Sequence, residues 1–225
     1  SARTLKQWSQ KVLALVKMNK ELKTAFTDNS GSILDALMNH LFTQLQNRID
    51  SVRYMSKETF ADVLKLQFYL HESEVQKIEW KKGFISFLLK SSRQDKAMYM
   101  GLECALDIIA GEEILVFWPT IVGDLLCVGV ENRELSTYVG ECIVKLSQHD
   151  RSPSDVWLHR WISPLAQFNS HMDNVKEGFF SNLLKHFLNS HPETLQFLFE
   201  ANHELVSCNI LLDCLKVARK LGILP

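Results

Sequence analysis

The sequence predicts an all-α protein, an α-solenoid of HEAT/armadillo-like antiparallel helix pairs. Apolar residues recur every three or four positions, as at Leu34, Leu37, Leu41 and Leu45, which is the period of an amphipathic helix. Strict alternation of apolar and polar residues never persists, and no Asn-Gly or Asp-Gly hairpin signal occurs. Helix pairs follow one another at about forty residues per pair, the repeat length of HEAT and armadillo arrays.

Residues that start or stop helices divide the chain at short intervals. Capping boxes, in which a serine side chain and a glutamine three positions later satisfy the first backbone N–H groups, are predicted at Ser73–Gln76 and Ser91–Gln94. Three prolines stand where a first helical turn accepts them: Pro153, Pro164 and Pro192. Three glycines stand where a helix should end: Gly31, Gly111 and Gly222.

These signals and the apolar period together predict the order of the helices. We expect helices over residues 4–26, 32–49, 52–70, 74–90, 93–109, 112–118, 120–128, 133–148, 153–162, 164–168, 173–189, 192–201 and 205–221. Short loops between them favour antiparallel neighbours. We therefore expect residues 1–225 to form a single segment of about five to six helix pairs, part of a longer solenoid.

One stretch carries a more specific repeat signal. "DSVRYMSKETFADVLK", which begins at Asp50, looks like the second helix of a HEAT unit, with its Asp and its Val-Arg pair. An ordinary globular helical domain is the alternative, because the helix pairs share little sequence with one another.

Composition limits the classes of protein to which the chain can belong. The 225 residues are 46% apolar, enough for a continuous core, and no run of eighteen apolar residues or signal-peptide pattern occurs. We expect no membrane span and a cytoplasmic location. The five cysteines are odd in number and widely spaced, which favours buried thiols over disulfides or a zinc site.

No motif for catalysis, cofactor binding or metal binding is present. The nine glycines are dispersed, so neither a Walker nor a Rossmann phosphate loop occurs, and there is no GxSxG nucleophile motif. His186, His191 and Glu193 form the densest histidine group, but Pro192 breaks the helix that an HExxH zinc site requires. We expect a protein that is not an enzyme, with no cofactor and no metal.

Charge is uneven along the chain, although the net charge is -1. Residues 1–27 carry six basic residues and one acidic residue, whereas residues 112–141 carry six acidic residues and one basic residue. In the first segment, a basic stripe on one side of the expected helix could contact RNA phosphates or a partner: Lys11, Lys17, Lys20 and Lys23. A solvated helix face is the alternative interpretation of this stripe.

The stretch "DVWLHRWISPL", residues 155–165, places Trp157 and Trp161 four residues apart on one face of a helix. Buried packing is favoured over stacking on nucleobases, because burial of tryptophan contributes strongly to a helical core. Each buried indole N–H then needs a hydrogen-bond acceptor. Pro164 is expected to restart or bend the array after these two residues.

Several stretches in collinear order resemble the thyroid adenoma-associated protein family. They are "DSVRYMSKETF", "YMGLECALDIIAGEEIL", "DVWLHRWISPL", "HPETL" and "LKVARKLG". In the second of these stretches the matching positions are Tyr99, Leu102, Cys104, Ile109, Glu112, Ile114 and Leu115. The resemblance runs from about Asp50 to the C-terminus and implies an internal piece of a very long helical-repeat protein.

The resemblance implies a function that the residues alone do not. Members of this family act as the non-catalytic partner of an S-adenosylmethionine-dependent tRNA 2'-O-methyltransferase that modifies ribose 32 of the anticodon loop. The chain would then be a scaffold or regulatory segment that positions the methyltransferase and tRNA, with no functional residue carried over to a specific position. A general protein-interaction scaffold unrelated to RNA is the alternative, with acidic residues 112–141 as its contact face.

Overall fold

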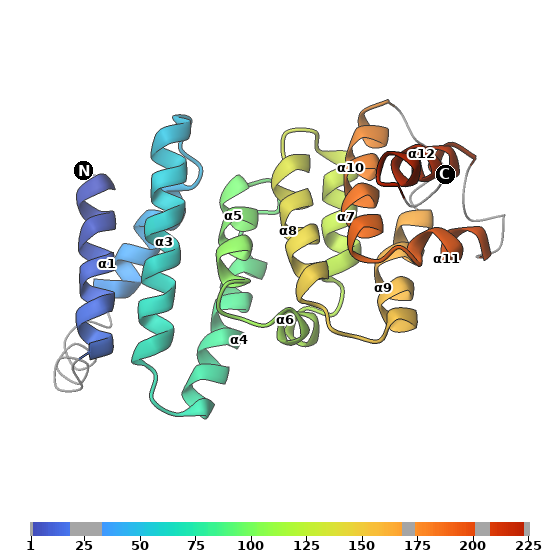
Figure 1. Ribbon diagram of the computed structural model, residues 1–225. Coiled ribbons are helices and arrows are strands. Elements are labelled where there is room, and N and C mark those ends of the chain that lie inside the picture. Colours follow the sequence, from blue (N-terminus) through green and yellow to red (C-terminus); the bar gives the residue numbers. More distant parts are fainter. Residues whose placement is uncertain (1, 19–32, 168–173, 201–207, 223–225) are drawn as a thin grey trace. The chain divides into compact units, whose positions relative to one another are not determined.

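A computed structural model describes residues 2–18, 33–167, 174–200 and 208–222 (Figure 1). Every regular element within these ranges is an α-helix, which confirms the all-α class. Two compact units make up the chain, Ser1–Ala110 and Gly111–Pro225. That the whole chain forms one solenoid segment stays a prediction.

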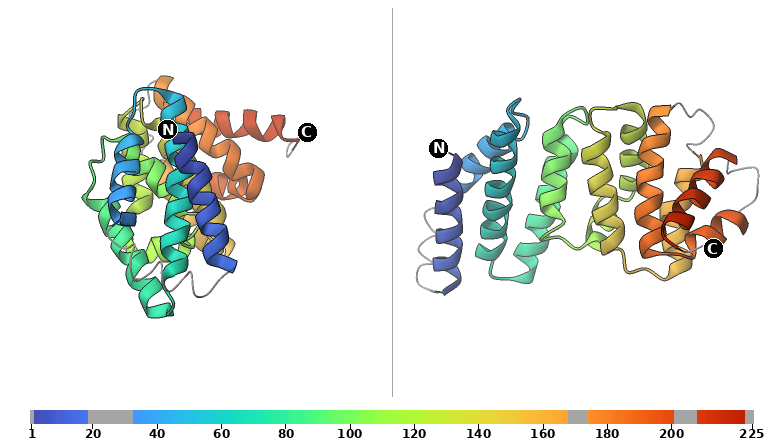
Figure 2. Two further views of the ribbon diagram at one scale, coloured as in Figure 1. Left: turned by 90° about the vertical axis from the view of Figure 1, so that its left-hand side faces the viewer. Right: turned by 45° about the horizontal axis from the view of Figure 1, so that its top comes forward.

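The first unit is a stack of helices with α3 at its centre. Its helices are α1 (Ala2–Met18), an unlabelled helix over residues 33–44, α3 (Asp50–Leu70), α4 (Glu74–Lys90) and α5 (Lys96–Ala105). Helix α3 packs against α1 and also against α5, and Figure 2 shows α1 and α3 side by side. Phe42 of the unlabelled helix makes an edge contact with Phe87 of α4, at 4.8 Å between ring centroids. Full burial of Phe60 and Phe84, at about 1.5–3 kcal/mol each, stabilises the unit.

Helices of the second unit alternate between two layers. They are α6 (Gly111–Phe117), α7 (Ile121–Glu131), α8 (Ser136–His149), α9 (Ser154–Gln167), α10 (Asn174–Ser190), α11 (Thr194–Glu200) and α12 (Cys208–Lys220). One layer contains α8, α10 and α12, with α10 in contact with both neighbours, and α9 contacts α7 and α11 in the other. In Figure 1, α8 and α10 lie side by side. Packing of every second helix against the next is typical of helical repeats.

Several predicted helix ends are confirmed and others are wrong. Ser73 and Gln76 form the expected capping box of α4, and Gly222 has the expected positive φ of 71° after α12. Ser91 does not form a box with Gln94, because α5 begins only at Lys96, after a turn. Gly111 is the first residue of α6 rather than the end of a helix.

Lengths also differ from those predicted at two helices of the first unit. The helix expected over 32–49 is helical over 33–44 and ends in a turn, where Gln46 and Asn47 donate to carbonyls three residues back. The helix expected over 93–109 is helical over 96–105. The shortened ends lie in turns, where local hydrogen bonds replace the regular helical pattern.

Pro164 does not start a new helix, so the prediction of two helices over 153–168 is wrong. It lies inside α9, which continues to Gln167. A proline in a helix removes one backbone hydrogen bond and usually breaks the helix. Here Trp161, Ile162 and Leu165 are all buried on either side of it, and their packing outweighs the lost hydrogen bond.

None of the single helices in the described ranges is both long and apolar enough to span a membrane; α6 and α7 meet that test only as a pair, bent by 91°. Among the cysteines described, Cys104 and Cys142 are buried thiols, as predicted, and Cys127 is half-buried. Side chains of Cys208 and Cys214 lie outside the described residues.

Candidate functional site

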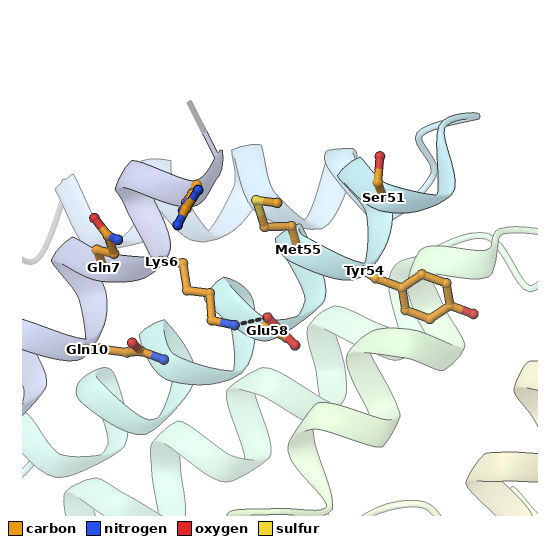
Figure 3. Close-up of a pocket in the computed structure, with 8 residues that line it drawn as sticks. Lys6, Gln7, Gln10, Ser51, Tyr54, Met55 and Glu58 are labelled. Atoms are coloured by element: carbon orange, nitrogen blue, oxygen red, sulfur yellow. Dashed lines mark hydrogen bonds and ion pairs between the residues drawn. The ribbon is translucent and has the colours of Figure 1, made fainter.

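An open groove of about 630 Å³ lies between α1 and α3 (Figure 3). Each helix contributes four residues at i, i+3, i+4 and i+7, the spacing of one helix face. They are Arg3, Lys6, Gln7 and Gln10 from α1, and Ser51, Tyr54, Met55 and Glu58 from α3. The groove therefore follows the line along which the two helices pack.

One ion pair crosses this groove. Figure 3 shows Lys6 reaching from α1 to the carboxylate of Glu58 on α3. The side chains are 34% and 57% exposed, so water screens the pair and its contribution to stability is small. Because the carboxylate of Glu58 neutralises Lys6, the groove keeps one net positive charge, the guanidinium of Arg3.

A buried polar contact lies beside the groove. The hydroxyl of Ser9 on α1 lies 3.3 Å from the carboxylate of Asp62 on α3 and 2.9 Å from the carbonyl of Lys6, and the two acceptors share its single proton. Burial raises the pKa of Asp62, and the hydrogen bond from Ser9 and the charges of Lys65 and Lys6 only partly oppose this effect. These contacts fix the register of α1 against α3.

The groove is lined by polar side chains and one aromatic ring. It offers a guanidinium, two amides, a serine hydroxyl and the ring of Tyr54, which is 53% exposed. These groups can contact a phosphate or a polar peptide, but no histidine or cysteine lines the groove. It is a shallow polar contact surface between two helices.

The structure describes only part of the predicted basic stripe. Lys11 is exposed on α1 but is not among the residues that line the groove. Lys17 belongs to α1, but its side chain lies outside the described residues, as do Lys20 and Lys23 entirely. The basic residues of α1 that line the groove between α1 and α3 are Arg3 and Lys6, whose spacing in the sequence places them on one helix face.

Trp157 and Trp161 both lie in the core of the second unit, each with 1% of its surface exposed. The indole of Trp157 donates to the carbonyl of Ser147 at 3.1 Å, and that of Trp161 donates to Asp150 at 2.9 Å. Each buried indole thus has the acceptor that it needs. Sequence reasoning did not identify Asp150, because its importance depends on the packing of α9 against the end of α8.

Asp150 joins the loop after α8 to α9 by several hydrogen bonds. Its carboxylate accepts from the backbone and side chain of Ser152, from Arg160 at 2.6 Å and from Trp161. Burial would raise the pKa of Asp150, but the hydrogen bonds from Ser152, Trp161 and Arg160 outweigh it and hold the pKa below its usual value. The side chain is fully buried and ionised, a structural centre rather than a reactive one.

Of the predicted histidine group, His191 packs against the core just before α11, whereas His186 is exposed on α10. His191 stacks on Trp157 at 3.9 Å between ring centroids, and its Nδ1 lies 3.1 Å from Glu193. The pKa of Glu193 is lowered, first by a hydrogen bond from its own backbone N–H and then by the side chains of His191 and Ser154. Burial opposes this effect only in part. Across the described part of the chain, no group of three or more His, Cys, Asp or Glu is placed to hold a metal ion.

No family model matches the chain. The tRNA (32-2'-O)-methyltransferase regulator THADA of Homo sapiens is 22% identical over 258 residues, and that of Chlorocebus aethiops is 23% identical over 257 residues. Both alignments cover 98% of this chain but 13% of the relative. The THADA protein of Gallus gallus is 22% identical over 245 residues, with the same coverage.

Among solved structures, an engineered protein is similar at a TM-score of 0.36 and 13% identity, over 98% of this chain and 92% of that chain. This likeness is too low to support a fold assignment. The chain spans about 13% of the length of the curated relatives that it matches. It is therefore similar, at low identity and over nearly its whole length, to one part of proteins named as regulators of a tRNA methyltransferase.

Proposed function

We propose that this chain is a non-catalytic helical segment of a regulatory subunit for a tRNA 2'-O-methyltransferase that acts on nucleotide 32. The observation that carries the proposal is an alignment through 98% of the chain with proteins named as regulators of that enzyme. The resemblance in the order of short sequence stretches points to the same family.

Two features of the described residues agree with a role in positioning. The helices pack in layers, and the polar groups buried between them, such as Asp150, serve the packing. A scaffold that holds an enzyme and its substrate in register can accelerate a reaction by reducing the entropy lost on encounter, without a catalytic side chain of its own.

The proposed contact with tRNA is the basic stripe of the N-terminal region, Lys11, Lys17, Lys20 and Lys23. Lys11 is exposed on α1, and Arg3 lies on the same helix. Lysine and arginine side chains that neutralise phosphates release counterions, so such a contact should depend strongly on salt. The proposed partners are thus the methyltransferase, which uses S-adenosylmethionine, and its tRNA substrate.

Affinity purification of the natural protein that contains this chain tests the proposal. We expect it to recover an S-adenosylmethionine-dependent methyltransferase, and the purified complex to methylate the ribose of nucleotide 32 in tRNA, as measured by mass spectrometry of RNA fragments. The regulator alone should bind no S-adenosylmethionine. Recovery of neither the methyltransferase nor tRNA would contradict the proposal and favour an interaction scaffold unrelated to RNA.

The basic stripe is tested separately, with the chain of 225 residues and labelled tRNA. Simultaneous changes Lys17→Glu, Lys20→Glu and Lys23→Glu should weaken binding and reduce the slope of log affinity against log salt by about one per lost phosphate contact. Lys185→Glu, at an exposed position of α10, is the control with the same type of charge change. Equal affinity of the triple variant and the unchanged chain would rule out the basic stripe.

A further inference from the structure

A second groove in the first unit, of about 350 Å³, lies between the helix of residues 33–44 and α4, with α3 beneath it. Its walls are two helix faces. Asp35, Met38 and Asn39 come from the first helix at i, i+3 and i+4, Trp80, Gly83, Phe84 and Phe87 come from α4 at i, i+3, i+4 and i+7, and Gln67 comes from α3. The space between these faces suits one side chain of a partner rather than a whole helix.

Gly83 keeps the groove open on the side of α4. A Cβ atom at this position would meet nothing within 4 Å, so the space above it is unfilled by the protein. Glycine in the middle of a helix is unfavourable for helix formation, and a larger residue would fit here without a clash. A larger side chain at position 83 would therefore extend into open space beside the groove.

Gln67, which lines this groove, has a buried acceptor atom. It is 7% exposed, and its Nε2 donates to Asp35 Oδ1 at 2.9 Å. A carboxylate can only accept, so this contact fixes which end of the amide is the oxygen. The Oε1 atom is buried and has no hydrogen-bond partner in the described part of the molecule, which is unfavourable unless a ligand supplies a donor.

The remaining walls are aromatic and acidic. Trp80 and Phe87 are half-buried, and Trp80 stacks on Phe84 with 12° between the ring planes. Asp35 is exposed and is the one charged residue among those that line the groove. Phe68, which contacts Trp80, already lies within 6 Å of two lysines of the same chain, Lys77 and Lys81, so this aromatic cluster attracts cations.

We infer that this groove binds an arginine side chain of a partner protein. A guanidinium is planar, stacks on aromatic rings and carries five N–H donors, which can serve Gln67 Oε1 and the carboxylate of Asp35 together. Phosphate is disfavoured, since the lining residues include a carboxylate and no lysine or arginine. Lysine fits less well, because its compact ammonium does not stack. This inference is independent of the proposed role in tRNA methylation.

Titration of the full chain with Nα-acetyl-arginine amide tests the inference. The indole N–H resonance of Trp80, assigned by its loss in Trp80→Phe, should shift saturably with the arginine probe. Nα-acetyl-citrulline amide, which has the same shape without the charge, should bind at least tenfold more weakly. Equal shifts with both probes, no shift with either, or a larger shift with uridine monophosphate would overturn the inference.

Two variants locate the binding. Gly83→Leu should abolish the shift by filling the groove while it favours the helix, whereas Gly123→Leu in α7, where a Cβ also meets nothing within 4 Å, should leave the shift unchanged. Asp35→Asn should weaken binding of the arginine probe several-fold and bring its affinity close to that of the citrulline probe. Full binding by the Gly83→Leu variant would place the arginine elsewhere and contradict the assignment.

Discussion

Two helix junctions of this molecule use an aspartate and an arginine in opposite ways. In the first turn of α3, the side chain of Arg53 is buried, at 8% exposed, while that of its partner Asp50 is 75% exposed. Before α9, the side chain of Asp150 is completely buried, while that of Arg160 is 33% exposed. The buried member of the pair is the arginine in one unit and the aspartate in the other.

The buried member determines which other groups the junction must supply. Arg53 directs one N–H group to the carbonyl of Asn47 at 2.7 Å and another to Asp50, so it closes the turn before α3. Asp150 instead collects donors from Ser152, Arg160 and Trp161. A buried charge without such partners is strongly unfavourable, so the junction at Asp150 depends more on a single residue than the junction at Asp50 does.

Truncation of Asp150 should have the largest effect. Asp150→Ala leaves the indole N–H of Trp161 buried without an acceptor and removes the partner of Arg160. We expect the free energy of unfolding to fall by about 3–5 kcal/mol, from about 1–3 kcal/mol for the unsatisfied indole N–H and about 1 kcal/mol for each hydrogen bond lost from Ser152 and Arg160. Urea denaturation followed by circular dichroism measures this change.

Asp150→Asn is the matched control for shape. It keeps one oxygen acceptor and should cost less than Asp150→Ala. A loss below about 1 kcal/mol for the alanine variant would contradict the central role of this carboxylate.

Acid should weaken the same junction. The pKa of Asp150 is lowered in the folded chain, so its stabilising effect is complete above the usual aspartate pKa of 3.8 and decreases as the pH falls below that value. Asp62 has the opposite effect on the pH dependence of stability. Its pKa is raised in the folded chain, so its protonation at low pH favours the folded state. Stability measured from pH 6 to pH 3 should fall less steeply in Asp150→Asn than in the unchanged chain. Parallel curves for the two would show that Asp150 does not titrate as described.

The fold class was predictable from the sequence because apolar residues recur at three- and four-residue steps in nearly every helix. The sequence also predicted the burial of Trp157 and Trp161, since a spacing of four residues places both on one face. The continuity of α9 through Pro164 was not predictable from local preference, because burial of its neighbours decides it. The groove beside Gly83 depends on contacts between residues far apart in the sequence, such as Asp35 and Gln67, which no single stretch reveals.

Replacement of Arg53 should have a smaller effect than truncation of Asp150. Arg53→Met keeps most of the apolar stem but removes the donor to the carbonyl of Asn47. We expect a loss of about 1–3 kcal/mol, the cost of leaving a polar group unsatisfied, because solvent-exposed Asp50 remains hydrated in the variant. Thermal unfolding of the two variants side by side measures the difference. A loss for Arg53→Met as large as that for Asp150→Ala would remove the contrast between the two junctions.

Neutralisation of Asp50 should have the smallest effect and tests the contrast most directly. Its carboxylate contacts Arg53 but is 75% exposed, so water replaces most of what the ion pair supplies. Asp50 also lies in the first turn of α3, where a negative charge interacts favourably with the helix dipole by a few tenths of a kcal/mol. We expect Asp50→Asn to change the free energy of unfolding by about 0.5 kcal/mol or less, with the change reduced further in high salt. A larger loss that persists in high salt would mean that Arg53 depends on Asp50 as strongly as Trp161 and Arg160 depend on Asp150. Burial of the carboxylate would then not explain the difference between the two junctions.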